Sequence, residues 1–209
     1  MYWAEFLTIA VAHLFAVASP GPDFAVVLKQ SVSAGTRTGV WTSLGVAAAI
    51  LLHVSYCVLG VALILLNSPT LFMVVKYLAA LYLLYLGIVS IRDSYRKQAE
   101  QGVSTNHQTT ESTPLSAFYI GFLTNGLNPK ATLFFLSLFT VVIAPTTPFM
   151  VQVGYGLYLS LATFLWFALL SFFLGRAKFR EAILNLGVWF ERIMGLILLI
   201  LAFQIAIIS

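Results

Sequence analysis

Two short motifs place charged residues beside prolines within otherwise apolar segments. The first reads Ser-Pro-Gly-Pro-Asp and ends at Asp23, and the second reads Asn-Pro-Lys and ends at Lys130. A carboxylate attracts an ammonium group and a lysine attracts a carboxylate, so these residues carry the charges needed to bind both ends of a small zwitterion. The same charges could instead form a structural ion pair that holds two parts of the chain together. Both interpretations remain open at this point.

The prolines of both motifs expose backbone groups that a continuous helix would use internally. Proline has no N–H and clashes with the preceding turn, so it leaves carbonyl oxygens without helical partners. Pro22 and Pro129 each suit the first position of a new helical segment, and Asn128 suits the N-cap ahead of the second. The start of a helix presents unpaired N–H groups and a partial positive charge. The motifs therefore predict two broken helices with polar backbone at each break.

These groups together predict a binding site between the two breaks. The ammonium of the zwitterion would face Asp23 and the freed carbonyls, and its carboxylate would face Lys130 and the N–H groups of the second half-helix. Asparagine amides, which both donate and accept hydrogen bonds, would complete the site. The candidate substrate-binding residues are Pro20, Gly21, Pro22 and Asp23 in the first motif, and Asn125, Asn128, Pro129 and Lys130 in the second.

Three residues are candidates for carrying protons. A proton and the substrate ammonium would compete for the carboxylate of Asp23, which is the minimum that antiport requires. His13 and His53 lie in the first two apolar segments, and imidazole titrates near neutral pH in water, so both are candidates for a proton relay. The alternative for each histidine is a simple hydrogen bond to a neighbouring helix.

The composition requires the chain to hold these residues inside a membrane. Hydrophobic residues make up 60% of the 209 residues and charged residues only 9%, whereas soluble domains are about half apolar and a quarter charged. The one cysteine, Cys57, excludes an intrachain disulfide. The net charge of +4 does not indicate a nucleic-acid partner, because the cations lie near the ends of apolar segments. A carboxylate such as Asp23 at mid-membrane is unfavourable by about 2.5 kcal/mol or more, so we expect it to serve a function.

Six apolar segments follow one another along the chain, at about 3–29, 40–66, 69–91, 116–143, 149–175 and 188–208. Each is long enough to cross a hydrocarbon layer of about 30 Å. A polar stretch over 92–115 separates a first half (1–91) from a second half (116–209), so we expect one integral membrane domain over 1–209 with a cytoplasmic linker in the middle. Three spans per half place the halves in opposite orientations. The sequence thus predicts an all-α polytopic membrane protein of six transmembrane helices, a 3+3 inverted repeat whose first and fourth helices are broken.

Lysines and arginines are concentrated at the odd-numbered connections between segments. Lys29 and Arg37 lie at the first, Arg92 lies at the third and Arg180 lies at the fifth, whereas the second and fourth connections and both tails carry none. Because cations favour the cytoplasmic side, both termini are predicted to lie outside. If the broken first segment folds back instead of crossing, five spans remain and the N-terminus lies inside.

The motifs Ser-Pro-Gly-Pro-Asp-Phe at 19–24 and Gly-Phe-Leu-Thr-Asn-Gly-Leu-Asn-Pro-Lys-Ala at 121–131 resemble the lysine exporter superfamily. Within it, the chain is most similar to the homoserine/threonine resistance branch of bacterial amino-acid efflux proteins. The aspartate after Pro-Gly-Pro is similar to the threonine-efflux subgroup. The resemblance covers essentially the whole chain. It implies a multi-pass transporter of the bacterial inner membrane that exports small amino acids, such as threonine or homoserine, by proton antiport and without a cofactor.

Other classes fit the residues less well. No zinc-binding HExxH motif or serine nucleophile motif is evident, so we do not expect an enzyme. A divalent cation exporter, as in sister families, would need several acidic or soft ligands within the spans, whereas Asp23 is the one clear intramembrane carboxylate. A non-transporting membrane scaffold would leave the buried charges without a purpose. The expected partners are an amino acid, protons and membrane lipid, and small residues at helix surfaces leave a homodimer open.

Overall fold

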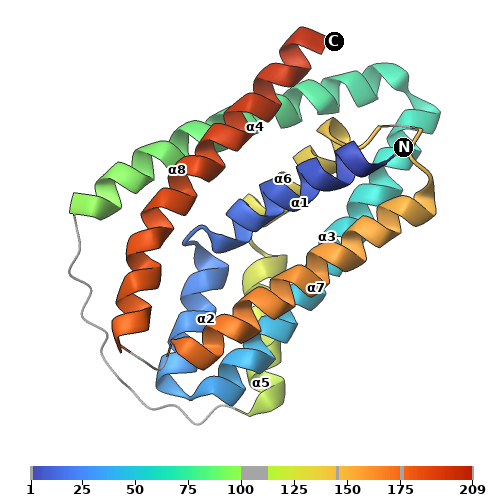
Figure 1. The fold of residues 1–209 in the computed structure, drawn as a ribbon. Coiled ribbons are helices and arrows are strands. Elements are labelled where there is room, and N and C mark those ends of the chain that lie inside the picture. Colours follow the sequence, from blue (N-terminus) through green and yellow to red (C-terminus); the bar gives the residue numbers. More distant parts are fainter. Residues whose placement is uncertain (1, 100–112, 145, 175–176, 209) are drawn as a thin grey trace.

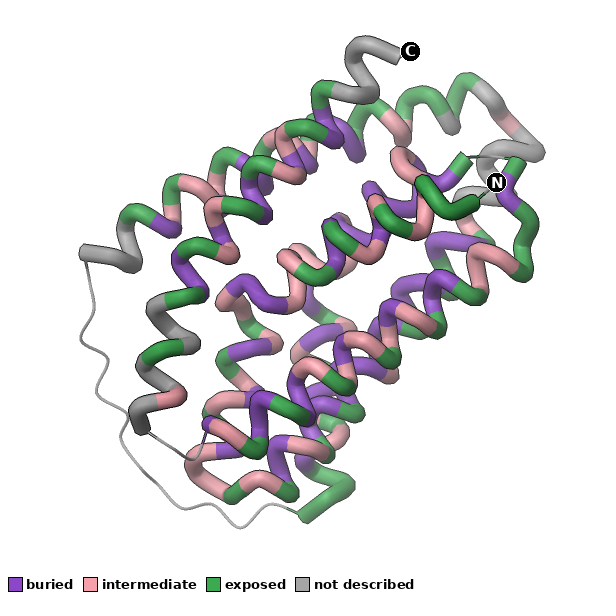
Figure 2. The backbone as a smooth tube through the Cα atoms, viewed as in Figure 1, coloured by how far each residue is buried: buried purple, intermediate pink, exposed green. Residues whose placement is uncertain are grey.

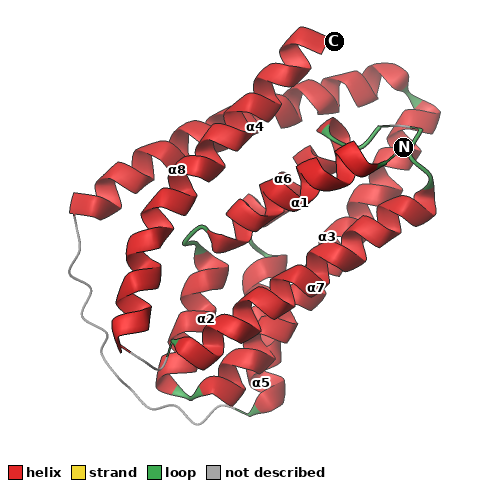
Figure 3. Cartoon of the chain, in the orientation of Figure 1, coloured by secondary structure: helices red, strands yellow, loops and turns green. Residues whose placement is uncertain are grey.

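A computed structural model describes residues 2–99, 113–144, 146–174 and 177–208 of the chain. All regular structure within these ranges is helical, and they contain no strand (Figure 3). The helices are α1 (Trp3–Ala18), α2 (Pro22–Ser33), α3 (Thr36–Asn67), α4 (Pro69–Ala99), α5 (Pro114–Gly126), α6 (Pro129–Val141), α7 (Phe149–Phe173) and α8 (Ala177–Ile208). The predicted all-α class is therefore confirmed for the described residues.

The chain leaves helical geometry at the first proline motif. α1 ends before the motif, α2 begins at Pro22, and the two helices are bent relative to each other by 51°. Gly21 is the N-cap of α2 in an extended conformation, and it supplies no side-chain hydrogen bond to the helix start. Pro22 can occupy the first position because an N–H there would have no helical partner.

The second proline motif has the same layout with one addition. α5 and α6 are separated by two residues, and α6 begins at Pro129. Asn128 is the N-cap, as the sequence predicts: its Oδ1 accepts a hydrogen bond of 3.0 Å from the backbone N–H of Lys130. This side-chain bond stabilises the start of α6, typically by about 1 kcal/mol.

Four helices are long and apolar enough to cross a membrane, through Thr36–Gly60, Met73–Tyr95, Phe149–Phe173 and Leu186–Phe203. The pair α1 and α2 meets the same test only when both helices are taken together, and α6 is apolar but shorter. The described residues therefore contain four spans, or five with the bent pair, by length and composition. This is the pattern of a multi-pass membrane protein.

The helices connect two opposite ends of the molecule (Figure 1). The start of α1, the end of α8 and the α3–α4 and α6–α7 connections lie at the upper right. The α2–α3 connection, the start of α5, the end of α7 and the start of α8 lie at the lower left. The chain thus alternates in direction, and its two termini lie at the same end.

α3 and α5 approach each other so closely that their backbones touch. A β-carbon added to Gly45 would lie 1.9 Å from the carbonyl oxygen of Phe118, and one added to Gly121 would lie 2.1 Å from the carbonyl oxygen of Thr42. Only glycine permits such an approach, as in other close-packed membrane helices. α5 is therefore fixed against α3 by its backbone.

α1 meets α7 less closely. A groove between them is lined by Tyr2, Trp3, Phe6, Val151, Gly154 and Tyr155. A β-carbon added to Gly154 would meet nothing within 4 Å. Near the start of α1, polar contacts reach the connection before α7: Glu5 accepts hydrogen bonds from the Thr147 hydroxyl at 2.9 Å and from the Ala144 N–H at 3.1 Å.

Buried residues face the spaces between helices, and exposed residues face outward (Figure 2). Many of the exposed side chains are large and apolar, including Leu81, Leu169 and Phe172, which are 62%, 57% and 64% exposed. Exposing so much apolar surface to water would be unfavourable, whereas the hydrocarbon of a membrane solvates it. The exterior therefore fits a lipid environment.

The predicted polar linker begins later than the sequence indicated. α4 continues to Ala99, so the first part of the stretch 92–115 is helical, and residues 100–112 lie outside the described residues. Arg192 of α8 helps to extend α4, since its Nε donates a hydrogen bond of 3.2 Å to Ser94 and its guanidinium lies 4.4 Å from the ring centre of Tyr95. Contacts with α8 therefore stabilise the end of α4, although the polar composition of this segment indicates a solvated linker.

Candidate functional site

Both proline motifs border one cavity between the helices. The space open to the centres of water-sized molecules is about 70 Å³. A water molecule needs about 10–15 Å³ of such space, so the cavity has room for roughly five waters. Each water occupies about 30 Å³ in the liquid, and five waters together have about the volume of a small amino acid. Its lining comprises His13, Ala16, Val17, Ser19, Gly21, Pro22, Asp23, Phe24, Val46, Ile50, Leu86, Asn125, Asn128, Lys130, Ala131, Phe134, Phe135, Thr163, Phe167 and Met194.

Most of the candidate substrate-binding residues lie together at this cavity. Those that line it are Gly21, Pro22, Asp23, Asn125, Asn128 and Lys130. Pro20 and Pro129 are outside this lining. Pro20 packs against α8, where a β-carbon added to Gly187 would lie 2.5 Å from its Cγ, and Pro129 starts α6. These two prolines shape the breaks.

A polar cluster joins the two motifs across the cavity. The Asn125 amide nitrogen donates a hydrogen bond of 3.0 Å to Oδ2 of Asp23, so the end of α5 is bonded to the first turn of α2. The Asn128 side chain and the Lys130 ammonium also interact with the Asp23 carboxyl. The geometry therefore places one acid, one base and two amides around one small space.

Three buried oxygen atoms at the cavity have no hydrogen-bond partner among the described residues. They are Oδ1 of Asp23, Oδ1 of Asn125 and the hydroxyl oxygen of Ser19. Buried polar atoms are hydrogen-bonded in the great majority of cases, and leaving one unpaired is unfavourable by about 1–3 kcal/mol. Three such oxygens around one cavity mark it as a place that accepts hydrogen-bond donors.

His13 lines the cavity from α1 and is bonded to α7. Its Nε2 lies 2.9 Å from the hydroxyl oxygen of Thr163, and both side chains are buried. Thr163 also borders the cavity. The pair thus adds a second polar position to the wall.

His53 lies behind the cavity wall and outside the lining. Its ring stacks on Phe135 with 5.5 Å between ring centres, and its Nε2 lies 3.1 Å from the carbonyl oxygen of Asn125. Its Nδ1 is hydrogen-bonded to the hydroxyl of Tyr56. Of the two predicted relay histidines, the structure therefore brings only His13 to the cavity surface.

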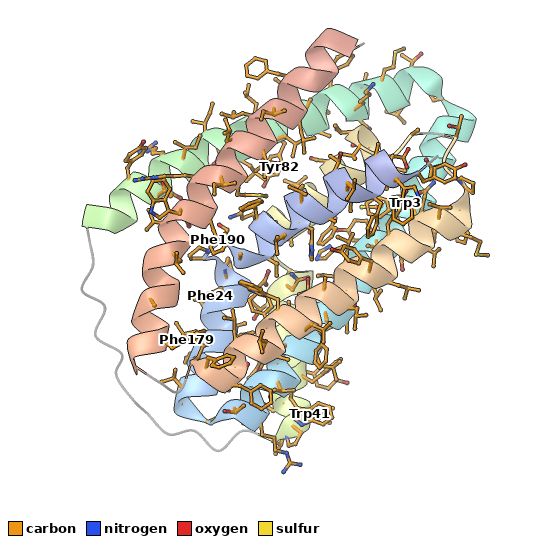
Figure 4. The ribbon with its side chains drawn as sticks, in the orientation of Figure 1. Trp3, Phe24, Trp41, Tyr82, Phe179 and Phe190 are labelled. Atoms are coloured by element: carbon orange, nitrogen blue, oxygen red, sulfur yellow. The ribbon has the colours of Figure 1, made fainter. Side chains whose placement is uncertain are left out.

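The remaining wall is apolar. Phe134 and Phe135 of α6 meet edge to face with 5.4 Å between ring centres, and Phe167 closes the wall from α7. Phe24, labelled in Figure 4, extends from α2 into a buried cluster that includes Val46 and Phe167. One part of the cavity is thus polar and charged, and the rest is hydrocarbon.

Several residues at the site were not singled out by the sequence. Ser19 is the first residue of the first motif but was not among the candidate binding residues, whereas Thr163 and Met194 carry no local signal. The expectation of a single clear intramembrane carboxylate was wrong, because Glu191 of α8 is only 3% exposed within an apolar span. Within the described part of the chain, no three His, Cys, Asp or Glu residues come together as a metal site.

Comparison with known proteins gives similar sequences over most of the chain. Threonine efflux proteins of Salmonella typhimurium and Escherichia coli are 27% and 26% identical over 190 residues, which cover 91% of this chain and 91% of theirs. A leucine efflux protein of Salmonella typhi is 36% identical over 150 residues, covering 70% of this chain and 65% of that protein. No solved structure gives a significant match.

The family comparison covers both motifs and every helix that borders the cavity. The model of the LysE type translocators matches residues 14–209, from the middle of α1 to the end of the chain. This chain therefore belongs to the LysE type translocator family.

Proposed function

We propose that this protein exports a small amino acid, which binds in the cavity between the two proline motifs. The family and the similarity to amino-acid efflux proteins indicate a membrane transporter of amino acids and not an enzyme. The observation that carries the site is the placement of Asp23 and Lys130, from opposite halves of the chain, at one cavity of amino-acid size.

The polar part of the cavity suits an ammonium group. An ammonium has three N–H donors, and three residues of the cavity lining, Ser19, Asp23 and Asn125, each carry a buried oxygen without a partner among the described residues. The negative charge of Asp23 adds to this attraction, since hydrogen bonds with an ionised partner are about twice as strong as neutral ones. The substrate ammonium would thus take the place that the sequence assigned to it.

The carboxylate of the substrate would bind at the second motif. Lys130 supplies the positive charge, and the start of α6 adds the partial positive charge of a helix N-terminus. The N–H of Lys130 is already bonded to Asn128, which leaves the next N–H, on Ala131, as the backbone donor nearest the cavity. A lysine and one backbone donor are enough to orient a carboxylate.

The apolar wall favours an aliphatic substrate side chain. Beyond the polar cluster and Ser19, the hydrogen-bonding side chains of the lining are His13 and Thr163, which bond to each other. A threonine hydroxyl would have to compete for this pair, whereas a side chain such as that of valine or leucine would contact Phe134, Phe135 and Phe167 directly. We therefore place aliphatic amino acids ahead of threonine.

We propose a six-span topology in the bacterial inner membrane for this transporter. The alternation of helix direction in Figure 1 supports one crossing by α1 with α2 and one by α5 with α6. The two halves then form the 3+3 inverted repeat, with both termini outside and cations at the cytoplasmic end. Export by proton antiport would follow if a proton and the substrate ammonium compete for Asp23.

An efflux assay on purified protein tests the proposal. Proteoliposomes loaded with leucine, valine, threonine, homoserine, lysine or glutamate are followed with and without an imposed pH gradient. We expect leucine and valine to leave faster than threonine, efflux to accelerate with the gradient, and lysine and glutamate to stay inside. Efflux of no amino acid above that of empty liposomes contradicts the proposal.

A further inference from the structure

His53 occupies a position created by the second proline motif. In a continuous helix the carbonyl oxygen of Asn125 would accept a hydrogen bond from the N–H of residue 129. That residue is Pro129, which has no N–H. The oxygen accepts a hydrogen bond of 2.9 Å from the backbone N–H of Asn128, and Nε2 of His53, a fully buried side chain, lies 3.1 Å from the same oxygen.

The hydrogen bonds fix the tautomer of the His53 ring. A carbonyl oxygen only accepts hydrogen bonds, so Nε2 must carry the proton that it donates to Asn125. In the neutral ring Nδ1 is then an acceptor, and it receives the hydroxyl proton of Tyr56. Both ring nitrogens are engaged, and the partner at Nε2 is a carbonyl that cannot pass a proton onward.

The same ring also contacts α6, so it bridges the break. It stacks on Phe135 at an interplanar angle of 13°, and its partner Tyr56 is hydrogen-bonded to Thr132 in the first turn of α6. His53 therefore touches the last turn of α5 and, directly and through Tyr56, the first two turns of α6. At the Asn125 carbonyl, this side-chain contact adds to the backbone hydrogen bond from Asn128.

The orientation of Asn125 matters to the cavity, because its side-chain amide holds Asp23 at 3.0 Å. We propose that His53 is a positioning residue of the substrate site, which gives the Asn125 carbonyl a second hydrogen bond and so holds Asn125 toward Asp23. In this role it carries no proton between the two sides of the membrane. The inference rests on the proposed function, since it assigns a role within that binding site.

Two substitutions separate positioning from proton relay. The side-chain amide of His53→Gln can donate the same hydrogen bond but cannot titrate, whereas His53→Leu fills similar volume and donates nothing. We expect His53→Gln to keep gradient-driven export with a KM near that of the unchanged protein. His53→Leu should raise KM about tenfold with little change in maximal rate, in line with the loss of a buried hydrogen bond. Cys57→Ala, one turn further along α3 and outside the lining, is the matched control and should change neither parameter.

A double-mutant cycle tests whether His53 acts through Asn125. Asn125→Ala removes the amide that holds Asp23, so adding His53→Leu to it should raise KM by less than twofold. Hydrogen exchange followed by mass spectrometry provides a readout without transport. Amides over 123–132 should exchange faster in His53→Leu than in His53→Gln, and those of α8 should be unchanged.

Three outcomes overturn the proposal. A His53→Leu protein with unchanged KM and unchanged exchange over 123–132 shows that the contact positions nothing. A His53→Gln protein that exchanges amino acids across the membrane but ignores the pH gradient shows a proton relay. Fully additive effects with Asn125→Ala show that His53 acts elsewhere. If the unchanged protein moves no amino acid, the proposed function fails, and the exchange measurement still decides the positioning role.

Discussion

Asp23 and Lys130 lie in opposite halves of the chain, yet both border the same cavity. Neither helix alone determines their proximity. The hydrogen bond between Asn125 and Asp23 joins the two breaks, and Asn128 and Lys130 act on the same carboxyl from the start of α6. The residues that carry charge are therefore held by the residues that interrupt the helices.

Removing the charge of Asp23 tests whether the pair binds substrate or only stabilises the protein. Asp23→Asn keeps the size of the side chain and loses the ionic attraction, so amino-acid binding should weaken about 10- to 100-fold. Lys130→Gln should do the same from the carboxylate end. The measurement is the concentration dependence of efflux from proteoliposomes, with the amount of protein in the membrane determined by quantitative blotting.

The two interpretations predict opposite outcomes for these variants. A binding site gives normal protein yield without export, whereas a structural ion pair gives reduced yield. Export at the unchanged rate by both Asp23→Asn and Lys130→Gln would exclude the proposed mechanism.

For single residues of the candidate site, the sequence predicts those that belong to the two proline motifs and few others. Asp23, Asn125, Asn128 and Lys130 stand beside prolines and could be selected by residue type alone. Thr163 and Met194 could not, because they enter the site through the packing of α7 and α8. The contact of His53 with the Asn125 carbonyl depends on the packing of α3 against the end of α5, which no local sequence pattern encodes.

The helices around the cavity are held by two kinds of contact. α5 touches α3 through backbone at Gly45 and Gly121. α1 meets α7 across a groove and through the hydrogen bond between His13 and Thr163, and Glu5 bonds to the connection before α7. The sequence indicates that small residues pack helices but not which pairs they join. It also places the end of α4 too early, because the contacts of Arg192 with Ser94 and Tyr95 come from α8.

Adding one methyl group to the α3–α5 contact should separate these helices. Gly121→Ala puts a β-carbon 2.1 Å from the Thr42 carbonyl oxygen, which the backbone cannot accommodate without shifting. We expect a loss of stability of about 1–3 kcal/mol or more, as for other overpacked sites. The thermal unfolding midpoint in detergent measures it. Gly154→Ala, whose β-carbon meets nothing within 4 Å, is the control and should leave the midpoint unchanged.

The polar contact at the start of α1 should respond to loss of Glu5. Glu5→Ala removes the acceptor for the Thr147 hydroxyl and the Ala144 N–H, bonds worth about 0.5–1.5 kcal/mol each. Hydrogen exchange should therefore speed up over 3–9 and 142–148. Thr8→Ala is the control, because that hydroxyl bonds only to the carbonyl of Ala4 in its own helix. Equal exchange in the two variants would show that Glu5 does not hold α1.

At the scale of the whole molecule, the two ends differ in what they carry. The end with both termini also carries the α3–α4 and α6–α7 connections, and the opposite end carries the α2–α3 connection (Figure 1). Lys29 and Arg37 flank that connection and are exposed. Two exposed cations therefore lie at the end opposite the termini. The sequence can predict this placement, because it requires only counting lysines and arginines in each connection between apolar segments.

The proposed topology makes a direct prediction for fusion proteins. Alkaline phosphatase joined to the C-terminus should be active, since it folds outside, and a fluorescent protein joined there should stay dark. A fluorescent protein inserted within 100–112 should fluoresce. A bright fluorescent fusion at the C-terminus would contradict the proposed orientation, because it would place that terminus in the cytoplasm. A bright fusion at the N-terminus alone would mean that α1 and α2 fold back without crossing the membrane.

The unequal attachment of α1 and α5 has a consequence for alternating access. A rocking motion that separates α3 from α5 must break apart two backbones in direct contact, whereas one that lifts α1 from α7 parts side chains around a groove and the hydrogen bond between His13 and Thr163. The bend between α1 and α2 gives α1 a pivot beside the substrate carboxyl group, Asp23. We therefore expect the first half-helix to act as the lever of the transport cycle, with its counterpart in the second half as the fixed support.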